Sequence, residues 1–517
     1  MKDAPTQLMA AIDIGSSAIR MDVAEVRPGR TIRVLESLKK GVQLGRETFT
    51  QGYLSQETIR AACRALQDFK KVLDTYGVSS YRAVSTSAVR ESDNSETFLD
   101  RLRTSSGLEV EIINGPEENR LTLLAVMQSI RGVPDLTRDT CLLVEVGGGS
   151  TDVSLLDAGE LRQSGSFPLG SIRLRAEAET GPANHDERVR FLQRRIGGLL
   201  ANIRRAIGFE DAARCVALGG DVRFASRVLG APALAGGITS IGRDDFEGFV
   251  RALCPMPVEE LVCKYSISYL DAETLVPALL TYLGLLAETR SVDIAVSDAS
   301  IRAGILADMA PGSRDASREK LRGHILASAR SLGRKFHCDE THAERVRALA
   351  ARLFDELRIE HRMTDTHRLY LEIAALLHDA GLFVSPRAHH KHSLYLIASS
   401  ELFGLRNREM DLIANIARYH RRDLPQRSHE SFTALDRNER VIVSKLAAIL
   451  RVANALDKDH LETAVDLRIA REGDQIILEA PDLEDLTLAR FALDGRSNLF
   501  AEVFGKSILL RGRGAPA

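Results

Sequence analysis

Two patterns of hydrophobic and polar residues alternate over the first 300 positions of the chain. Short apolar runs such as MAAIDIG (9–15) and IRMDVAEV (19–26) predict strands. The segment SQETIRAACRALQDFKKVLDTYG (55–77) spaces its apolar residues three or four apart, which predicts a helix capped by Ser55 and ended by Gly77. Such alternation is typical of an α/β fold. It continues with a strand at the start of YRAVSTSAVRESDN (81–94) that leaves through a polar loop, a strand in LEVEIIN (108–114), and a helix through EENRLTLLAVMQSI (117–130).

The pattern changes twice after residue 308. The segment MAPGSRDASREK (309–320) is rich in Pro, Gly, Ser and charge, which predicts a linker, and helical spacing follows it to about residue 460. Histidine usage supports the break, because only His185 precedes position 324 and the other twelve histidines lie between His324 and His460. From residue 461 two apolar runs around a turn predict a small β-rich end. We therefore expect four domains: a first lobe (1–125), a second lobe (126–308), a helical domain (309–460) and a small end domain of mixed α and β structure (461–517).

An approximate internal repeat links the two expected lobes. The segment AIDIGSSAIRMDVAEV (11–26) superposes on LVEVGGGSTDVSLLDA (143–158), so that Asp13 falls on Glu145 and Gly15 on Gly147. Each copy reads as a strand, an acidic residue, a glycine-containing turn and a second strand. Two such hairpins predict two similar α/β lobes that face each other across a cleft. This arrangement resembles that of actin, sugar kinases and heat-shock ATPases, which implies paired phosphate-binding turns.

Composition narrows the possible class and location of the protein. At 517 residues the chain is too long for a single core. It contains no run of 18 apolar residues, so the sequence predicts no membrane span. The short apolar N-terminal stretch is interrupted by Asp13, and the six cysteines contain no CxxC pair, so we expect a cytoplasmic protein with reduced thiols. A formal charge of −2 argues against a nucleic-acid binder. It leaves room for a local basic groove that holds a smaller polyanion.

The second turn of the repeat, VEVGGGSTD (144–152), has the composition of an anion site. Consecutive glycines let backbone N–H groups converge on one point, and Ser150 and Thr151 add hydroxyl donors. Glu145 and Asp152 would repel a bound phosphate unless a divalent cation or a water lay between them, which indicates Mg²⁺. The alternative is a tight hairpin whose glycines only need a positive φ, and the similar turn at Asp13 favours the phosphate site.

Two further segments contain residues suited to phosphate chemistry. In INGPEENRLT (113–122), Glu117 and Glu118 either offset the dipole of a helix that begins near Pro116, or one of them orients a water for attack on phosphorus. Arg90, in STSAVRESDN (85–94), either neutralises phosphate oxygens or is an ordinary surface arginine.

Taken in order, four motifs resemble those of the exopolyphosphatase/guanosine pentaphosphate phosphohydrolase (Ppx/GppA) family. They are DIGSSA (13–18), TSAVRESDN (86–94), GPEEN (115–119) and EVGGGSTD (145–152), and they match the family's two turns, its arginine segment and its helix start. Weaker matches extend the resemblance over most of the chain, in FPLGSIRL (167–174), ALGGDVRFAS (217–226), LVPALL (275–280) and VSDASIRAGIL (296–306).

The resemblance implies a role for each matching residue. Glu118 aligns with the family's catalytic base and Arg90 with its phosphate-contacting arginine, whereas Glu117 serves as a control position. Glu145 and Asp152 would be the acids associated with Mg²⁺. The two phosphate-binding turns would comprise Asp13, Gly15, Ser16 and Ser17 in the first, and Gly147, Gly148, Gly149, Ser150 and Thr151 in the second.

The chain departs from the family pattern at several of these positions. Ser17-Ala18 replaces an Asn-Ser pair in the first turn, and the two acids of the second turn are exchanged, with Glu145 for Asp and Asp152 for Glu. Each exchanged carboxylate moves by about one methylene, and shifts near 1 Å affect catalysis. Asn119 and Ala303 stand where the family has Ala and Glu.

The helical region has a second resemblance, to HD-type phosphohydrolase domains. It rests on HAERVRALA (342–350), AALLHDAGLF (374–383), HHKHSLYLI (389–397), ARYHRR (417–422) and AAILRVANALD (447–457). By that resemblance His342, His378 and Asp379 would be metal ligands. The distal acid is replaced by Asn454, with Asp457 as the nearest substitute, so we expect a structural or polyphosphate-binding role rather than a second active site. A basic groove would be formed by Arg387, His390, Lys391, His392, Arg421 and Arg422, and the alternative is a solvated face.

Together these observations predict a cytoplasmic, Mg²⁺-dependent exopolyphosphatase. The predicted reaction removes terminal phosphate from inorganic polyphosphate, from guanosine pentaphosphate, or from both, in a homodimer that binds neither nucleic acid nor membrane. Two alternatives are an ATPase or kinase of the same fold and a polyphosphate or alarmone sensor that binds without cleaving.

Overall fold

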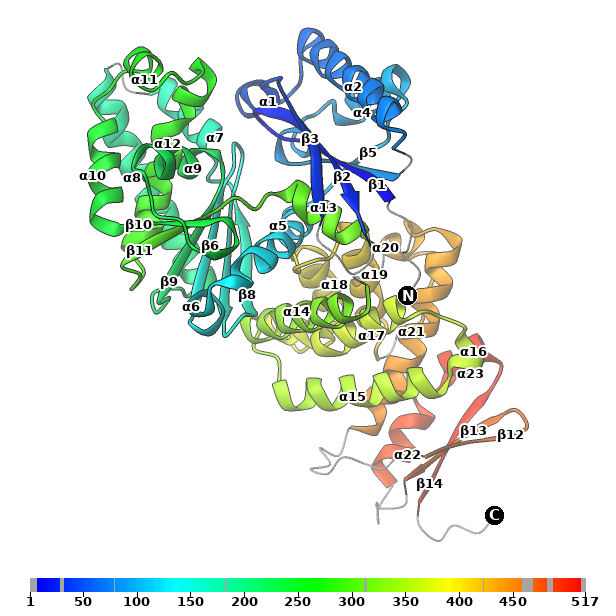
Figure 1. Ribbon diagram of the computed structural model, residues 1–517. Helices are drawn as coiled ribbons and strands as arrows, with labels where there is room; N and C mark the ends of the chain where they lie inside the picture. The colour runs from blue at the N-terminus through cyan, green and yellow to red at the C-terminus, as the bar shows by residue number, and fades with distance from the viewer. Residues whose placement is uncertain are drawn as a thin grey trace. The chain divides into compact units, whose positions relative to one another are not determined.

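The computed structural model describes residues 7–27, 32–78, 80–181, 184–310, 314–421, 423–457, 468–480 and 487–512, and it divides into two compact units, Met1–His324 and Ile325–Ala517 (Figure 1). The division falls within helix α14 (Arg314–Lys335). This helix occupies most of the segment 309–320, so the prediction of a linker there was wrong. The reason is local composition, because residues 314–320 include Ala, Arg, Glu and Lys, which favour a helix.

The first lobe is built on a five-stranded sheet of order β3-β2-β1-β4-β5. Helix α2 covers it as predicted: the Ser55 hydroxyl accepts a hydrogen bond from the backbone N–H of Thr58 at 3.2 Å, and Gly77 ends the helix with φ 67°. Leu66 and Phe69 of α2 are fully buried in the core. The elements are β1 (Gln7–Ile14), β2 (Ala18–Val26), β3 (Arg33–Gly41), α1 (Leu44–Gln51), α2 (Gln56–Tyr76), β4 (Ser80–Ser85), α3 (Ser87–Arg90), α4 (Ser95–Ser106) and β5 (Val110–Ile112).

The second lobe is built on a six-stranded sheet of order β10-β11-β9-β6-β7-β8, with helices α8 to α12 gathered together in Figure 1. Its core is a single apolar cluster that these helices share with the strands. The elements are α6 (Pro134–Arg138), β6 (Cys141–Val146), β7 (Thr151–Asp157), β8 (Glu160–Phe167), α7 (Ser171–Glu179), α8 (His185–Ile207), β9 (Arg214–Leu218), α9 (Gly220–Val228), β10 (Ile238–Gly242), α10 (Arg243–Leu253), α11 (Val258–Tyr265), α12 (Tyr269–Ala287) and β11 (Asp293–Ser297).

The two sheets repeat the same topology, which agrees with the internal repeat of the sequence. The order β3-β2-β1-β4-β5 corresponds to β8-β7-β6-β9-β11, and β10 is an added edge strand. In both hairpins the predicted acidic residue, Asp13 or Glu145, is the penultimate residue of the first strand. Asp13 pairs with Arg20 across β1 and β2, and Glu145 pairs with Asp152 across β6 and β7. The fold thus places equivalent carboxylates beside both turns.

Two helices that pack against each other connect the lobes. Helix α5 (Gly115–Ser129) lies against β7 and β8, and α13 (Ile301–Met309) lies against β1 and β2. Their approach is so close that a Cβ atom at Gly304 would overlap the carbonyl oxygen of Leu121. The position of α5 matters for function, because Glu117 and Glu118 lie in its first turn.

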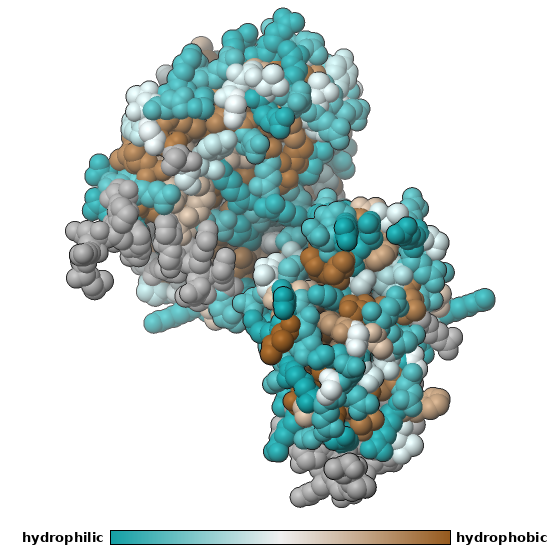
Figure 2. All heavy atoms as spheres, turned by 90° about the vertical axis from the view of Figure 1, so that its right-hand side faces the viewer, coloured by the Kyte–Doolittle hydropathy of each residue, from teal (hydrophilic) through white to brown (hydrophobic). Residues whose placement is uncertain are grey.

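Helix α12 is the one helix of the described part of the chain that is long and apolar enough to cross a membrane. Most of its apolar window is buried inside the protein, where Leu275, Leu279 and Leu286 belong to the core of the second lobe. Figure 2 shows hydrophilic side chains over most of the visible face and apolar ones in smaller patches between them. The position of α12 in the core of the second lobe therefore explains its apolar character.

The second unit combines a helical bundle with a three-stranded sheet of order β12-β13-β14. The sheet agrees with the predicted β-rich end, and its parallel pair β13 and β14 is connected through α22 and α23. The elements are α15 (Glu340–Glu356), α16 (Arg358–His361), α17 (Asp365–Leu377), α18 (His389–Ala398), α19 (Asn407–Arg418), α20 (Glu430–Thr433), α21 (Arg437–Leu456), β12 (Arg468–Glu472), β13 (Gln475–Ala480), α22 (Thr487–Asp494), α23 (Asn498–Phe504) and β14 (Ser507–Gly512).

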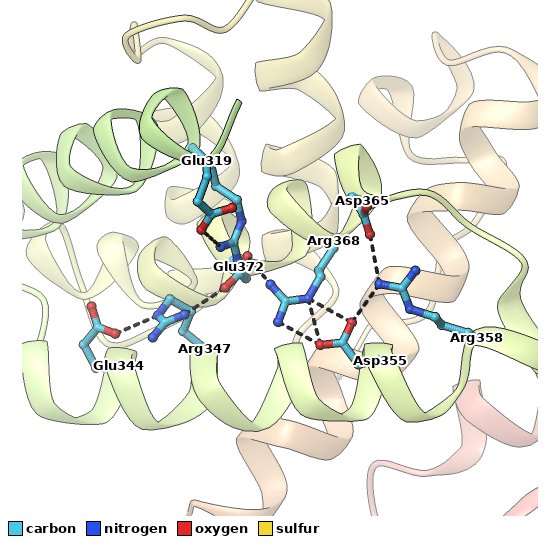
Figure 3. A network of polar contacts seen from close by, with 9 residues as sticks. Glu319, Glu344, Arg347, Asp355, Arg358, Asp365, Arg368 and Glu372 are labelled. Carbon is cyan, nitrogen blue, oxygen red and sulfur yellow. Dashed lines mark hydrogen bonds and ion pairs between the residues drawn. The ribbon is translucent and has the colours of Figure 1, made fainter. Parts of the chain in front are cut away.

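A polar network fastens α15 to α17 within this bundle (Figure 3). Glu372 of α17 is fully buried, and its carboxylate accepts hydrogen bonds from Arg347 Nη1 at 2.8 Å and from Arg368 Nη1 at 3.1 Å. Arg368 also contacts Asp355 of α15 at 2.8 Å. A buried carboxylate held by two guanidinium groups fixes how these two helices pack.

Candidate active site between the two lobes

The two glycine-containing turns line one cavity of about 420 Å³ between the lobes. The first turn is closed by a hydrogen bond from Gly15 N to Ala18 O at 3.1 Å, and the second by one from Gly147 N to Ser150 O at 2.8 Å. The predicted turn residues that line this cavity are Asp13, Gly15, Ser16, Ser17, Gly147, Gly148, Gly149 and Ser150, whereas Thr151 is fully buried and donates its hydroxyl to Leu169 O.

The glycines of the second turn are required by close packing rather than by backbone conformation. A Cβ atom at Gly148 would lie 2.9 Å from Ser16 Cβ, and one at Gly149 would overlap Ser87 and Phe49. Neither glycine has a positive φ. The alternative of a hairpin that needs positive φ is therefore wrong. Because Ser16, Ser87 and Phe49 belong to the first lobe, the missing side chains allow the two lobes to meet at the turns.

The neighbouring residues Glu117 and Glu118 have different surroundings. Asn114 caps α5 by accepting the Glu117 N–H at 3.0 Å. The Glu117 side chain is 4% exposed and is held by Arg120 Nε at 2.6 Å and by Arg82 Nη2 at 2.9 Å. These guanidinium groups oppose the effect of burial and keep the pKa of Glu117 below its ordinary value. Glu117 therefore serves as a structural anchor of the helix start.

Glu118 faces the cavity instead. Its Oε2 atom is buried without a hydrogen-bond partner. It forms a long ion pair with Arg90, whose Nη1 atom is 3.9 Å away. Burial raises the pKa of Glu118 well above its ordinary value, and the carboxylates of Asp152, Glu145 and Asp13 raise it further while Arg90 opposes them. A carboxyl group in these surroundings is suited to accept a proton.

The two acids of the second turn occupy different positions. Glu145 lines the cavity and accepts a hydrogen bond from Thr122 Oγ1 at 2.9 Å, while burial raises its pKa. Asp152 is 6% exposed and borders a smaller space beside Glu145, together with Asn119 and Ser154. Asn119, one of the departures from the family pattern, accepts the Ser154 hydroxyl at 2.9 Å and so ties α5 to β7.

The carboxylates around this cavity fit a Mg²⁺ ion. In phosphate-processing sites Mg²⁺ is usually held by one or two carboxylates together with phosphate oxygens, so a complete cage of protein ligands is not needed. Burial raises the pKa of Asp13 as well as those of Glu118 and Glu145. A divalent cation among these groups would relieve their mutual repulsion. Glu145 and Asp13 line the cavity and would hold the ion, whereas the other predicted acid, Asp152, borders the smaller space beside Glu145.

Arg90 contacts the segment before α5 and lies near the predicted base. Its Nη1 donates to Ile113 O at 2.6 Å and lies 3.9 Å from Glu118 Oε2. In this position Arg90 supports the β5–α5 junction and supplies positive charge beside Glu118.

Four arginines that line the cavity were not predicted from the sequence: Arg20, Arg223, Arg227 and Arg302. Arg20 of β2, Arg223 of α9 and Arg302 of α13 come from elements far apart in the chain. Arg20 and Arg302 each place an Nη1 atom 3.8 Å from Asp13 Oδ2. Arg223 and Arg302 lie within the motifs ALGGDVRFAS and VSDASIRAGIL. The arginine in each motif is the feature of the sequence from which a role in the site could have been predicted. These guanidinium groups supply positive charge for contact with a polyanion, in a cavity that also contains carboxylates.

The second unit brings together the three predicted HD-type ligands. The rings of His342 and His378 are 5.3 Å apart, and His378 Nε2 is 3.6 Å from Asp379 Oδ2. Asp457 accepts hydrogen bonds from His342 Nδ1 at 2.6 Å and from Arg345 Nε at 2.6 Å, so it orients His342. Asn454, which replaces the distal acid of the HD-type pattern, is buried, with 7% of its surface exposed.

The residues of the predicted basic groove differ in their surroundings. His390 lies 3.0 Å from Asp423, and burial lowers its pKa, which favours its neutral form. Arg387 and Lys391 are exposed, His392 and Arg421 are half-buried, and Arg422 lies outside the described residues.

Comparisons with known proteins cover almost the whole chain. Residues 22–313 match the Ppx/GppA phosphatase family and residues 326–494 match Ppx/GppA phosphatase domain III. A guanosine-5'-triphosphate,3'-diphosphate pyrophosphatase of Pseudoalteromonas atlantica is 24% identical over 502 residues, which cover 94% of this chain and 95% of that protein.

Among solved structures, the fold resembles the Aquifex aeolicus member of the Ppx/GppA protein family, with a TM-score of 0.50 and 24% identity over 59% of this chain and 97% of that one. It also resembles an exopolyphosphatase from Cytophaga hutchinsonii, with a TM-score of 0.53 and 23% identity over 59% of this chain and 97% of that one.

Proposed function

Because the chain belongs to the Ppx/GppA phosphatase family, we propose that it hydrolyses the terminal phosphate of inorganic polyphosphate, of guanosine pentaphosphate, or of both. The observation that carries the proposal is Glu118, a buried carboxylate without a hydrogen-bond partner that faces a cavity lined by two phosphate-type turns. Its neighbour Glu117 is fully engaged with arginines, which leaves Glu118 as the base.

The turns and the arginines bind the substrate in this proposal. Backbone N–H groups of residues 148–150 and the hydroxyls of Ser16 and Ser17 contact the terminal phosphate, while Arg20, Arg223 and Arg302 lie along the more distant phosphates. Phosphoryl transfer needs mainly positioning and charge stabilisation. The contact between Gly149 and the first lobe brings both sets of donors to one point.

Glu118 then takes a proton from a water that attacks the terminal phosphorus. The water oxygen forms a new bond to phosphorus, the bridging P–O bond breaks, and the shortened chain leaves with the bridging oxygen. Because the pKa of Glu118 is raised, its carboxylate is a stronger base than an ordinary glutamate. A Mg²⁺ ion bound near Glu145 and Asp13 would supply positive charge to the phosphate oxygens and lower the repulsion among the carboxylates.

We also propose that the helical unit provides a binding surface for long polyphosphate. Arg387 and Lys391 are exposed cations in this unit. We further propose that the enzyme works in the cytoplasm as a homodimer.

Phosphate release from long polyphosphate, guanosine pentaphosphate and ATP, with and without Mg²⁺, tests the reaction. Glu118→Gln is expected to lower the rate on the first two substrates by about 10²- to 10⁴-fold, the usual contribution of a general base. Glu117→Gln is the matched control, and it should lower stability while the folded enzyme keeps its turnover within a few-fold. Release from ATP alone would favour the ATPase or kinase alternative. Tight substrate binding without release, unchanged in Glu118→Gln, would favour the sensor.

A further inference from the structure

Helix α7 binds the carbonyl groups of the glycine turn 147–150. The backbone N–H groups of Ser171 and Ile172 donate hydrogen bonds of 2.9 and 3.0 Å to the first two carbonyls of the turn. The third carbonyl, that of Gly149, accepts its hydrogen bond from a side chain, the Nε–H group of Arg173, at 3.1 Å. Two peptide groups of the turn are thus held by the backbone of α7, and the third is held by one guanidinium group.

These carbonyl contacts determine where the N–H groups of the turn point. The peptide bonds of the turn are trans, so each N–H group points opposite to the carbonyl of the residue before it. Because the carbonyls are drawn toward α7, the N–H groups of Gly148, Gly149 and Ser150 are turned to the other side. All three residues line the cavity, and in the described part of the chain none of these N–H groups donates a hydrogen bond. They are therefore the donors that remain for a phosphate.

The start of α7 approaches the turn closely enough for these contacts because Gly170 has no side chain. A Cβ atom at Gly170 would overlap Gly148 O and the carbonyl carbon of Gly149. The φ of Gly170 is −93°, a value that any residue adopts. The glycine before α7 is therefore needed for its packing against the turn, and not for its backbone conformation.

The guanidinium group of Arg173 is itself oriented by the first lobe. Its Nη2 atom donates to Glu91 Oε2 at 2.7 Å and to Glu91 Oε1 at 2.9 Å. The group also stacks 4.2 Å above the ring of Phe49. Because one edge is bound to a carboxylate and one face lies on an aromatic ring, the planar group keeps a single orientation. Residues of the first lobe thus determine where the Nε–H group of Arg173 points.

We propose that Arg173 is a positioning residue of this site, an inference that rests on the proposed hydrolysis. By binding the Gly149 carbonyl, Arg173 aims the Ser150 N–H group at the terminal phosphate. Glu91 acts one step further back, because it orients the guanidinium group from the first lobe. The third backbone donor of the turn is therefore in place only while the two lobes are in contact.

Loss of the Arg173 guanidinium would replace a donor by an acceptor at this point of the site. The peptide group between Gly149 and Ser150 could then rotate, so that its carbonyl faces the phosphate instead of its N–H group. Removal of one preorganised donor to developing charge lowers kcat by about 10²- to 10³-fold, and a peptide that still visits the correct orientation loses less. We therefore expect a loss in kcat of about 10- to 100-fold. KM should change only a few-fold, because the donor acts mainly on charge that develops in the transition state.

Steady-state kinetics of the full-length chain on polyphosphate test the proposal. Arg173→Met removes the donors, keeps an unbranched side chain, and should show the expected loss in kcat with little change in KM. Arg175→Met is the matched control on the same helix: the two arginines are 21% and 18% exposed, and Arg175 binds Glu179 and Glu273. This control should keep kcat within a few-fold of the wild type. Equal losses of kcat in the two variants, or a folded Arg173→Met with the wild-type kcat, would overturn the proposal.

Binding of orthovanadate in the presence of Mg²⁺, measured by calorimetry, separates this inference from the proposed hydrolysis. Vanadate adopts the five-coordinate geometry of phosphorus during transfer, and its binding requires no turnover. Arg173→Met should weaken vanadate binding by the same factor as kcat and should leave the binding of inorganic phosphate within a few-fold. Wild-type vanadate affinity in the folded variant, or no vanadate binding by the wild type, would overturn the role of Arg173.

Two further outcomes are distinguished by the same measurements. Wild-type protein that binds vanadate but releases no phosphate from polyphosphate would refute the proposed hydrolysis, and the vanadate affinities would still decide the role of Arg173. If circular dichroism shows that Arg173→Met does not fold, Arg173→Lys takes its place in every assay. A single ammonium group cannot reproduce the planar fork that binds Glu91 and the Gly149 carbonyl together, so the same direction of change is expected.

Discussion

At the scale of single residues, Gly149 shows how a missing side chain can determine the shape of a site. An added Cβ atom there would overlap Ser87 and Phe49 of the opposite lobe, although the backbone conformation of Gly149 is open to any residue. The alanine variant therefore tests close packing without the complication of backbone strain.

We expect Gly149→Ala to hold the lobes apart and to lower kcat/KM about 5- to 150-fold, since overpacking of this kind costs about 1–3 kcal/mol and 1.4 kcal/mol is tenfold. Steady-state kinetics on polyphosphate measure the effect. Gly197→Ala is the control, because a Cβ atom at Gly197 of helix α8 meets no atom within 4 Å. Equal activity of both variants would show that the lobes need not touch.

Asp221, which lines the same cavity, gives a pH dependence of stability. Burial and the Asp271 carboxylate raise the pKa of Asp221 to about 7 from an ordinary value of 3.8. The folded protein thus holds this proton more tightly than the unfolded chain. The resulting stabilisation is complete below the ordinary value and is lost as the pH rises to about 7.

Asp221→Asn should therefore flatten the loss of stability between about pH 4 and pH 7. Denaturant unfolding of the two proteins at several pH values measures this. The slope should not vanish, because burial also raises the pKa values of Asp13 and Glu145. Identical pH profiles would show that Asp221 is ionised throughout.

At the scale of helices, the contact of α15 with α17 depends on the buried Glu372 (Figure 3). Glu372→Ala should lower the free energy of unfolding of the second unit by about 2–3 kcal/mol. This is less than for a fully buried pair, because the side chains of Arg347 and Arg368 are 23% and 21% exposed and stay partly hydrated. Urea unfolding measures the change.

Glu340→Ala provides the comparison in the same unit. The Glu340 and Arg334 side chains are 60% and 51% exposed and 3.4 Å apart, so the loss should stay below about 1 kcal/mol. Equal effects of the two variants would contradict the structural role of Glu372.

Elements with a strong local pattern were predictable, and those that depend on distant partners were not. Helix α2 has its predicted cap at Ser55 and its predicted end at Gly77 because both signals are local. The polar loop expected after β4 instead contains the short helix α3. Both turns of the repeat were found from the sequence, whereas Arg20, Arg223 and Arg302 meet only through the packing of three elements and could not be placed by spacing alone.

At the scale of the whole molecule, the two compact units carry different chemistry. The first contains the cleft, and the second contains the group His342, His378 and Asp379. Proteins with more than one domain often unfold in more than one step. Ligands that bind only one unit should therefore stabilise only one of these steps.

Calorimetry should accordingly show two transitions. Mg²⁺ with phosphate should stabilise only the first unit, by about 2.7 kcal/mol for a ligand at 100 times its dissociation constant. A single two-state transition that shifts as a whole with Mg²⁺ and phosphate would contradict independent units.

The contact between the lobes also has an optical consequence. Phe49 lies against Gly149 from the opposite lobe, and the guanidinium of Arg173, also from that lobe, stacks 4.2 Å above its ring. Because the chain contains no tryptophan, Phe49→Trp would introduce a single indole at this contact. Its emission would report whether the two lobes stay in contact at this point, without an attached dye.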